Sequence, residues 1–123
     1  MDNPKRKATY DTTSGPWKCD QAGYHNISPD WKGPGWYRFA KNVGNRIPEH
    51  TVKGHHCNTA ASGWLQDNHP TTVGMTKTAK VCFNNGYAGI CRWSTTIKIR
   101  NCGSYFIYNL PDTPGCQSGY CAE

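Results

Sequence analysis

Residues 92–121 read RWSTTIKIRNCGSYFIYNLPDTPGCQSGYC, and this stretch decides the predicted fold class. From Trp93 to Ile99, residues that can face a core alternate with polar residues, which is typical of a β-strand with one buried face. The Asn-Cys-Gly sequence at residues 101–103 offers a turn, because Asn and Gly tolerate positive φ. A second apolar run, residues 104–110, ends at a proline. The stretch therefore predicts a β-hairpin onto which the rest of the chain packs.

The composition predicts short strands separated by long loops. The chain has 123 residues, which is enough for one domain. Only 36% of the residues are hydrophobic, whereas glycine and proline are frequent at 13 and 8, so burial alone gives a marginal core. Gly35–Ala40 and Thr78–Phe83 are further strand candidates. The expected fold is mostly β: a small disulfide-stapled single domain with long irregular loops.

The N-terminal segment differs in character from the rest of the chain. Residues 1–16 are polar and lack a hydrophobic pattern, so we expect a flexible lead-in. Residues 17–123 are expected to form the cysteine-rich module. The basic run at residues 5–7 is compatible with a nuclear signal, but a solvated tail is the favoured interpretation.

Cysteine is expected to supply the stability that the core lacks. Seven cysteines in a chain of this size indicate disulfides and an oxidising compartment, so the protein is expected to be secreted or extracellular. No CxxC pair occurs, which disfavours a zinc site. The odd count leaves one cysteine without a partner inside the chain, and spacing alone does not choose among the possible pairings.

The chain is basic, with 14 Lys and Arg against 8 Asp and Glu. Such a surface can attract nucleic acid, anionic glycans or membrane headgroups. Disulfides argue against a nucleic-acid partner, because they place the protein in another compartment. No stretch approaches the roughly 20 apolar residues of a membrane span, so no membrane insertion is expected.

Histidines and aromatic residues are the other groups with functional potential. His50, His55 and His56 lie near Cys57, but neighbouring residues rarely converge on one ion, so neither a metal site nor a cofactor is expected.

Trp31, in a Pro/Gly-rich loop, is the aromatic residue expected to be exposed. Core packing is the favoured role of six others: Trp36, Phe39, Trp64, Phe83, Trp93 and Phe106.

Several short motifs together resemble one family. In order and spacing they are similar to the eight-cysteine extracellular module of uromodulin and the related pancreatic secretory-granule membrane glycoprotein. The resemblance covers about residues 19–121. The motifs are GWYRF at 35–39, HCNTAASGWL at 56–65, HP at 69–70, VCF at 81–83 and YNLPDTPGC with YC at 108–121.

The resemblance implies a pairing of the cysteines. Two family cysteines correspond here to Thr51 and Ile90, which amounts to one deleted bridge. Cys102 is left over, because its equivalent in uromodulin joins a cysteine upstream of the module. It is either simply unpaired or forms an intermolecular bridge, as in a disulfide-linked dimer. The three implied bridges are Cys19–Cys116, Cys57–Cys121 and Cys82–Cys91.

The resemblance also implies a function. These modules belong to secreted or membrane-anchored glycoproteins, have no known catalysis, and in the named proteins present a glycan to bacterial fimbrial lectins. The family's glycan site aligns at Asn109, which is followed here by Leu-Pro and forms no sequon. Asn26, in Asn-Ile-Ser, is the only remaining glycosylation candidate.

We therefore expect a non-catalytic extracellular recognition or adhesion module, part of a secreted or surface glycoprotein, with a protein or glycan partner. The alternative is a free-standing secreted basic protein, lectin-like or defensive, that binds anionic glycans. An enzyme is disfavoured, because a Cys–His nucleophile pair needs a free thiolate with an oriented base, and nothing near Cys102 in sequence provides one. No catalytic residue is assigned.

Overall fold

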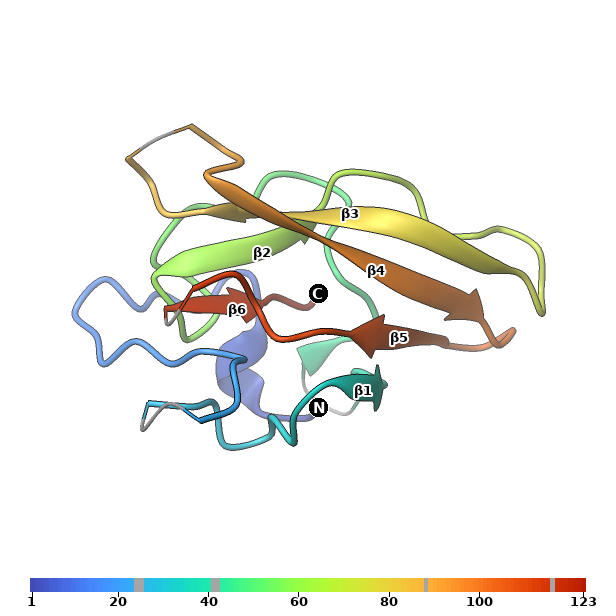
Figure 1. Cartoon of the computed structure of the whole chain (residues 1–123), viewed down its shortest axis with the longest axis horizontal. Helices are drawn as coiled ribbons and strands as arrows, with labels where there is room; N and C mark the ends of the chain where they lie inside the picture. The colour runs from blue at the N-terminus through green and yellow to red at the C-terminus, as the bar shows by residue number, and fades with distance from the viewer. Residues whose placement is uncertain (24–25, 41–42, 88, 116) are drawn as a thin grey trace.

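The computed structural model describes residues 1–23, 26–40, 43–87, 89–115 and 117–123. Within these residues the chain forms one six-stranded sheet with the order β1-β5-β4-β3-β2-β6 (Figure 1). The predicted mostly β fold is confirmed. The elements are the 3-10 helix η1 (Pro4–Arg6) and the strands β1 (Gly35–Tyr37), β2 (Ala61–Leu65), β3 (Thr76–Asn84), β4 (Trp93–Asn101), β5 (Phe106–Leu110) and β6 (Ser118–Tyr120).

The predicted hairpin is the pair β4–β5, and it lies in the middle of the sheet. Its strands are antiparallel, with register from Lys98 opposite Asn109 to Asn101 opposite Phe106. Along β4 the burial alternates as the sequence predicts. Asn101 supports the turn, because its Oδ1 accepts the Gly103 N–H at 2.8 Å while its Nδ2 donates to the Pro70 carbonyl at 2.8 Å.

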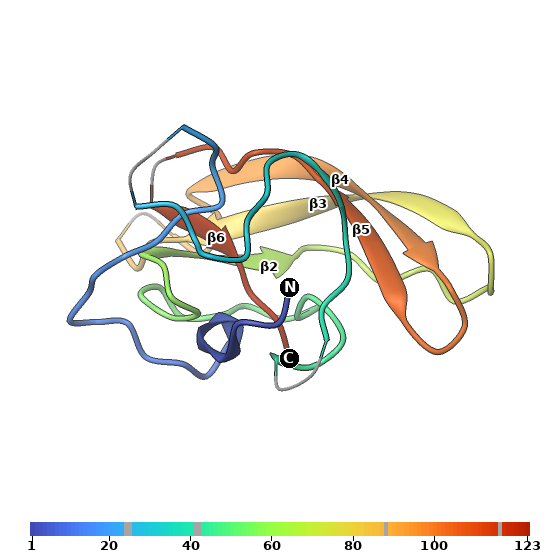
Figure 2. The same ribbon diagram turned by 90° about the horizontal axis from the view of Figure 1, so that it is seen from below.

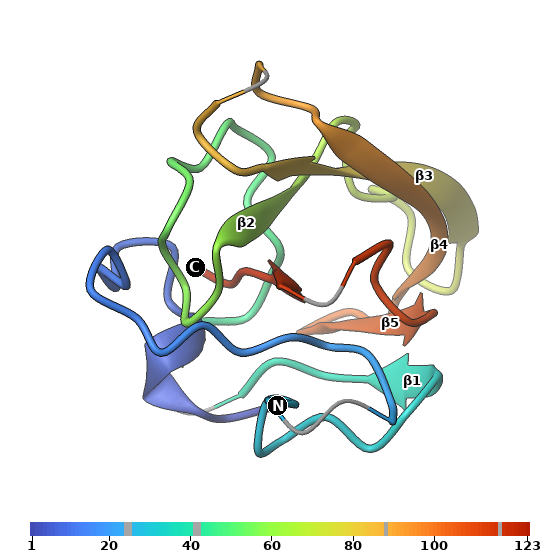
Figure 3. The same ribbon diagram turned by 60° about the vertical axis from the view of Figure 1, so that its left-hand side comes forward.

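The sheet is curled, and its concave face encloses the main core. Figure 3 shows β2 and β3 on one side of the curl and β5 with β1 on the other. Apolar side chains from both sides meet inside, which removes them from water and is the main favourable term in folding. The largest fully buried apolar and aromatic members of this core are Tyr108, Tyr120, Phe39, Phe83, Ile47, Leu65, Ile97, Ile99, Leu110, Val43 and Val81.

Strand β6 is parallel to β2, a pairing that the sequence did not predict. Ala61 lies opposite Ser118, and Gly63 opposite Tyr120. A Cβ atom on Gly63 would lie 2.7 Å from the Gly119 carbonyl oxygen, so this close approach of two backbones requires glycine. A strand of three residues carries too little period to be recognised from sequence.

The N-terminal segment is packed against the module, contrary to the flexible lead-in expected for residues 1–16. Arg6 is only 2% exposed. The backbones of residues 6–8 and Ala122 run side by side, with Ala8 N–H donating to the Ala122 carbonyl at 2.8 Å and Ala122 N–H to that of Arg6 at 3.0 Å. Figure 2 shows this blue segment beside the red C-terminal residues.

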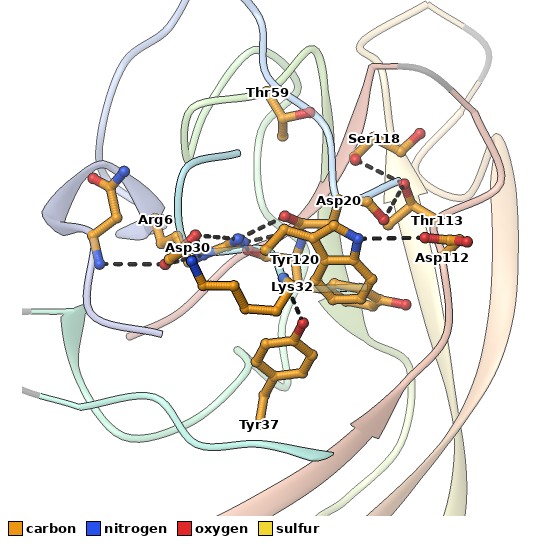
Figure 4. A network of polar contacts seen from close by, with 12 residues as sticks. Arg6, Asp20, Asp30, Lys32, Tyr37, Thr59, Asp112, Thr113, Ser118 and Tyr120 are labelled. Carbon is orange, nitrogen blue, oxygen red and sulfur yellow. Dashed lines mark hydrogen bonds and ion pairs between the residues drawn. The ribbon is translucent and has the colours of Figure 1, made fainter. Parts of the chain in front are cut away.

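Arg6 is the centre of a buried polar network (Figure 4). Its Nη1 and Nη2 donate to the two oxygens of Asp20 at 2.7 and 2.6 Å, and its Nε and Nη2 bind Asp30. Nη1 also donates to the Tyr120 carbonyl at 3.0 Å. All five guanidinium N–H groups therefore have an acceptor, which a buried arginine needs. Burial opposes charge on Asp30, but hydrogen bonds and charge from Arg6 hold its pKa below the usual value.

Trp31 is buried, contrary to expectation, and Trp36 is the more exposed of the two. Trp31 is 4% exposed and stacks on Tyr37 with ring centroids 4.9 Å apart, whereas Trp36 is 49% exposed. The indole N–H of Trp31 donates to Asp112 Oδ1 at 3.3 Å. The loop that carries Trp31 folds over the core because Asp20 and Asp30, which precede Trp31 in this loop, both bind Arg6.

Two disulfides are formed among the described cysteines, and both are pairs that the resemblance implies. Cys57 joins Cys121 across 64 residues, and Cys82 joins Cys91 across 9. These four cysteines pack with Val52 and Trp64 in a second apolar cluster, separate from the main core. The implied bridge from Cys19 falls on Cys116, which lies outside the described residues.

We expect the Cys57–Cys121 bond to contribute more to stability than any other feature of the second cluster. Replacing both cysteines by serine reopens a loop of about 65 residues, worth about 4 kcal/mol in the chain-entropy model. Thermal unfolding of the oxidised protein checks this. Cys102→Ser is the control, because Cys102 forms no disulfide with a described residue. Equal losses in the two variants would contradict the pairing.

Candidate functional site

A pocket of about 350 Å³ opens at the end of the sheet where β2, β4 and β6 begin and β3 ends, the left-hand end in Figure 1. Its volume is at the small end of the range of about 300–1,000 Å³ typical of ligand pockets. Segments far apart in the chain contribute to its lining, which consists of Trp17, His55, Ala60, Ala61, Asn85, Tyr87, Trp93, Gly115, Gln117 and Ser118. We call this the aromatic pocket.

Aromatic rings form a continuous wall of the aromatic pocket. The ring of His55 lies between those of Trp17 and Tyr87, with centroid distances of 5.2 and 5.8 Å. The indole N–H of Trp17 is held by the Thr12 carbonyl at 2.7 Å. Tyr87, at the rim, is 84% exposed. An aromatic side chain this exposed is a candidate ligand contact, because removing the apolar surface of its ring from water is favourable.

The backbone that presents His55 is strained. His55, Cys57 and Asn58 have φ values of 59°, 51° and 68°, a conformation that residues other than glycine adopt rarely and at a cost of about 1–3 kcal/mol each. The loop is held by the Cys57–Cys121 bond, by Cys57 N–H to the Tyr10 carbonyl at 2.9 Å and by His55 N–H to the Ala60 carbonyl at 2.8 Å. Strain of this kind gathers at binding sites, which favours the aromatic pocket as a functional one.

The aromatic pocket also contains uncharged polar groups. Ser118 Oγ is buried and has no hydrogen-bond partner among the described residues. Gln117 presents an exposed side chain, while its carbonyl accepts from Ala61 N–H at 2.9 Å. Asn85 Oδ1 accepts the Tyr87 N–H at 3.0 Å and so fixes the rim. No Lys, Arg, Asp or Glu occurs among the described lining residues.

The histidines weighed as metal ligands go to separate places. His50 Nε2 lies 2.8 Å from Glu123 Oε1, and that hydrogen bond raises the pKa of His50. His56 Nδ1 lies 3.0 Å from the Gly54 carbonyl, and His55 joins the aromatic wall. In the part of the chain that the structure describes, no group of three or more His, Cys, Asp or Glu side chains could hold a metal ion.

A second, larger pocket of about 600 Å³ lies between the N-terminal segment and the C-terminus. Its charged lining residues include Lys7, Lys53 and Glu123 together with His50 and His56. Glu123 and both of these histidines already have the partners given above. Lys7 and Lys53 are exposed to solvent. No Trp, Tyr or Phe occurs among the described residues that line this pocket, so it lacks the aromatic anchor that the aromatic pocket has.

A Glu-His-Tyr arrangement with a buried histidine and a buried tyrosine was not predicted from the sequence, although its histidine belongs to the His-Pro motif at 69–70. His69 Nδ1 lies 2.6 Å from Glu49 Oε2, and His69 Nε2 lies 2.7 Å from the Tyr108 hydroxyl. The Tyr108 oxygen also accepts the Ile47 N–H at 3.1 Å. Tyr108 is fully buried and lines neither of the two pockets described above, so its hydroxyl, which already has two hydrogen-bond partners, is not presented to a substrate. The arrangement anchors residues 47–49 to β5.

His69 gives the fold a predictable pH dependence. Burial lowers the pKa of His69, against the raising effect of Glu49. Between that lowered pKa and the unfolded value of about 6.5, the unfolded chain binds more protons than the folded one, so stability falls as the pH falls. We expect the loss between pH 7.5 and 5.5 to be smaller in His69→Gln, measured by urea unfolding at both pH values.

His50→Gln is the matched control for this measurement. The pKa of His50 is raised, so its protonation on folding adds stability as the pH falls through the same range. Its removal is expected to make the acid loss larger rather than smaller. A His69→Gln variant with the same pH dependence as the unmodified protein would contradict the assignment.

The other predicted site residues are scattered. Cys102 lies in the β4–β5 turn, at the opposite end of β4 from the aromatic pocket, and is half-buried. Asn26 is half-buried, and its Nδ2 donates to the carbonyl of Trp17 at 3.2 Å, which places the sequon beside the pocket wall. Asn109 lies on β5 opposite Trp36 and Lys98.

The outer face of the sheet carries a basic row that the sequence analysis did not identify. Lys80, Lys98 and Arg100 are exposed on the adjacent strands β3 and β4, opposite Thr96, Thr78 and Thr76 respectively. The register of two neighbouring strands brings these side chains together on one face. The alternating pattern of β4 could have predicted part of this row, because Lys98 and Arg100 occupy its outward-facing positions.

Comparison with known proteins shows the family. A family model that describes a uromodulin-like domain matches residues 37–122. Uromodulin of Mus musculus is 36% identical over 116 residues, which is 94% of this chain, and the pancreatic secretory granule membrane major glycoprotein GP2 of Homo sapiens is 33% identical over 122 residues, or 98%. The chain covers 18% and 20% of these two relatives, about a fifth of their length.

The relatives are extracellular glycoproteins, which supports the predicted extracellular location. Within the described ranges, no helix has the length and apolar character needed to cross a membrane. The chain has seven cysteines and so does not match the eight of the module that it resembles. With the family model matching most of its length, the chain belongs to the uromodulin-like domain family.

Proposed function

We propose that this domain is a non-catalytic recognition module of an extracellular glycoprotein and that it binds its partner through the aromatic pocket. The observation that carries the proposal is the wall formed by Trp17, His55 and Tyr87, which ends in a tyrosine exposed at the rim. A pocket with aromatic walls and a few fixed polar groups is the usual form of a ligand site.

Two further observations support binding rather than catalysis. Glu49, His69 and Tyr108 form a hydrogen-bonded set that could in principle carry out acid–base chemistry, but the Tyr108 hydroxyl is buried in the core. The uromodulin and GP2 relatives are non-enzymatic glycoproteins. A general base has to lie within hydrogen-bond reach of a substrate proton, and His69 is instead occupied on both ring nitrogens.

A second candidate function is binding of anionic glycans at the basic row. The specific observation is the clustering of Lys80, Lys98 and Arg100 on one exposed sheet face, with threonines as their cross-strand neighbours. Such a row attracts sulfated or carboxylated chains, and its attraction weakens as salt rises. The disulfide-linked dimer through Cys102 stays a separate prediction, which electrophoresis without reductant decides.

One binding experiment separates the two candidates. The oxidised domain is tested against neutral glycans, heparin, and purified secreted glycoproteins in native and enzymatically deglycosylated forms. We expect at least one of these probes to bind. Tyr87→Ala should weaken that binding at least tenfold, because about 1.4 kcal/mol of contact at an exposed aromatic anchor is lost. Lys98→Ala combined with Arg100→Ala is the matched variant and should leave it unchanged.

The reverse pattern would favour the second candidate. Loss of binding in the Lys98/Arg100 variant alone, together with retention on heparin above physiological salt of about 0.15 M, would assign the function to the basic row. Binding to no probe, or binding that neither variant alters, would contradict the proposed use of the aromatic pocket. Circular dichroism of each variant checks that the fold is retained.

A further inference from the structure

We infer that the ligand of the aromatic pocket is an uncharged sugar ring, bound with one face against the aromatic wall and with its hydroxyls directed to Ser118 and to the amides at the rim. This inference rests on the proposed function and names the chemistry of the partner at the same site. It is carried by the charge of the lining, by the pairing of apolar with polar groups, and by one unsatisfied hydroxyl.

The first argument is charge. The chain has a formal net charge of +6, yet no Lys, Arg, Asp or Glu lies among the described residues that line the aromatic pocket. An anionic ligand would be better placed on the row of Lys80, Lys98 and Arg100. A charged ligand buried without a partner is strongly disfavoured, so the lining selects an uncharged one.

The second argument is the mixture of surfaces. A pyranose ring has faces that carry C–H groups and a rim that carries hydroxyls. The rings of Trp17, His55 and Tyr87 offer apolar faces to the first, while Asn85 and Gln117 carry amides able to donate to and accept from the second. A purely apolar ligand would make no hydrogen bond to these amides and would displace water from the exposed Gln117 side chain, which is costly.

The third argument is Ser118. Its side chain is 1% exposed, lines the aromatic pocket, and its Oγ has no partner among the described residues. The residue is held in place through its backbone, because the Ser118 carbonyl accepts from Asp20 N–H at 3.0 Å and from Thr113 Oγ1 at 2.9 Å. A buried unpaired hydroxyl requires an explanation, and a sugar hydroxyl supplies both the donor and the acceptor that it lacks.

The test uses the oxidised domain and the methyl glycosides of common neutral pyranoses, each added up to about 20 mM, which reveals a dissociation constant in the millimolar range. Binding is followed by NMR through the indole N–H signals. We expect the signals of Trp17 and Trp93 to shift for at least one glycoside. That of Trp36, on the opposite edge strand β1, should stay unchanged.

Three variants sharpen the result. Tyr87→Ala should weaken binding at least tenfold, and Trp36→Ala, an exposed aromatic residue outside the pocket, should leave it unchanged. Ser118→Ala should weaken binding about three- to tenfold, the effect of one hydrogen bond, without lowering the melting temperature, because the hydroxyl has no described partner to lose. A purely structural role of Ser118 predicts the opposite: lower stability and unchanged affinity.

The outcomes separate this inference from the proposed function. If no neutral glycoside binds but a deglycosylated protein binds in a Tyr87-dependent way, the aromatic pocket is a recognition site and the sugar inference is overturned. If a glycoside binds equally well to Tyr87→Ala, its site lies elsewhere and the inference is also overturned. If no probe depends on Tyr87, both fail.

Discussion

The guanidinium of Arg6, enclosed by Asp20 and Asp30, is the interaction on which the rest of the structure depends. It joins three segments that have little regular structure of their own: the N-terminal segment, the loop from residue 20 to 30, and strand β6. Asp20 also accepts the N–H of Tyr120, so the same carboxylate that binds Arg6 fixes the edge strand. A charged group buried this deeply is tolerated only with full pairing, and here every donor has an acceptor. In Figure 3 the N-terminal segment lies at the open side of the curled sheet.

The aromatic pocket follows from that closure. Its base is the start of β6, where Ser118 lies opposite Ala61, and its wall is the strained loop at residues 55–58. The Cys57–Cys121 bond connects that loop to the residue after β6. Polar pairing at Tyr120, the last residue of β6, and the covalent bond at the next residue, Cys121, therefore hold the two halves of the pocket in fixed positions. A rigid, open pocket reduces the entropy lost on binding, which suits recognition without chemistry.

Periodicity predicted the middle of this fold, and long-range packing determined the rest. Alternation along β4 is strong because one face is buried and the other is wet, so the central hairpin could be predicted. The basic run around Arg6 looked like a solvated tail, because a sequence does not reveal that two aspartates many residues later converge on one guanidinium. The prediction that Trp31 is exposed was wrong for the same reason, since those contacts fold its loop inward. The resemblance to a known module supplied the cysteine pairs, whereas the aromatic pocket is assembled from distant loop residues that share no motif.

Urea unfolding of Arg6→Ala tests the central claim most directly. Removing the guanidinium leaves Asp20 buried without its cation, which is expected to cost about 3–5 kcal/mol of unfolding free energy. In the same variant the amide of Ala122, whose N–H is bonded to the carbonyl of residue 6, should lose its protection from hydrogen exchange. Lys5→Ala is the control, since this neighbouring cation is exposed. The account predicts a large loss for Arg6→Ala alone. A loss within about 0.5 kcal/mol of that control, with Ala122 still protected, would contradict it.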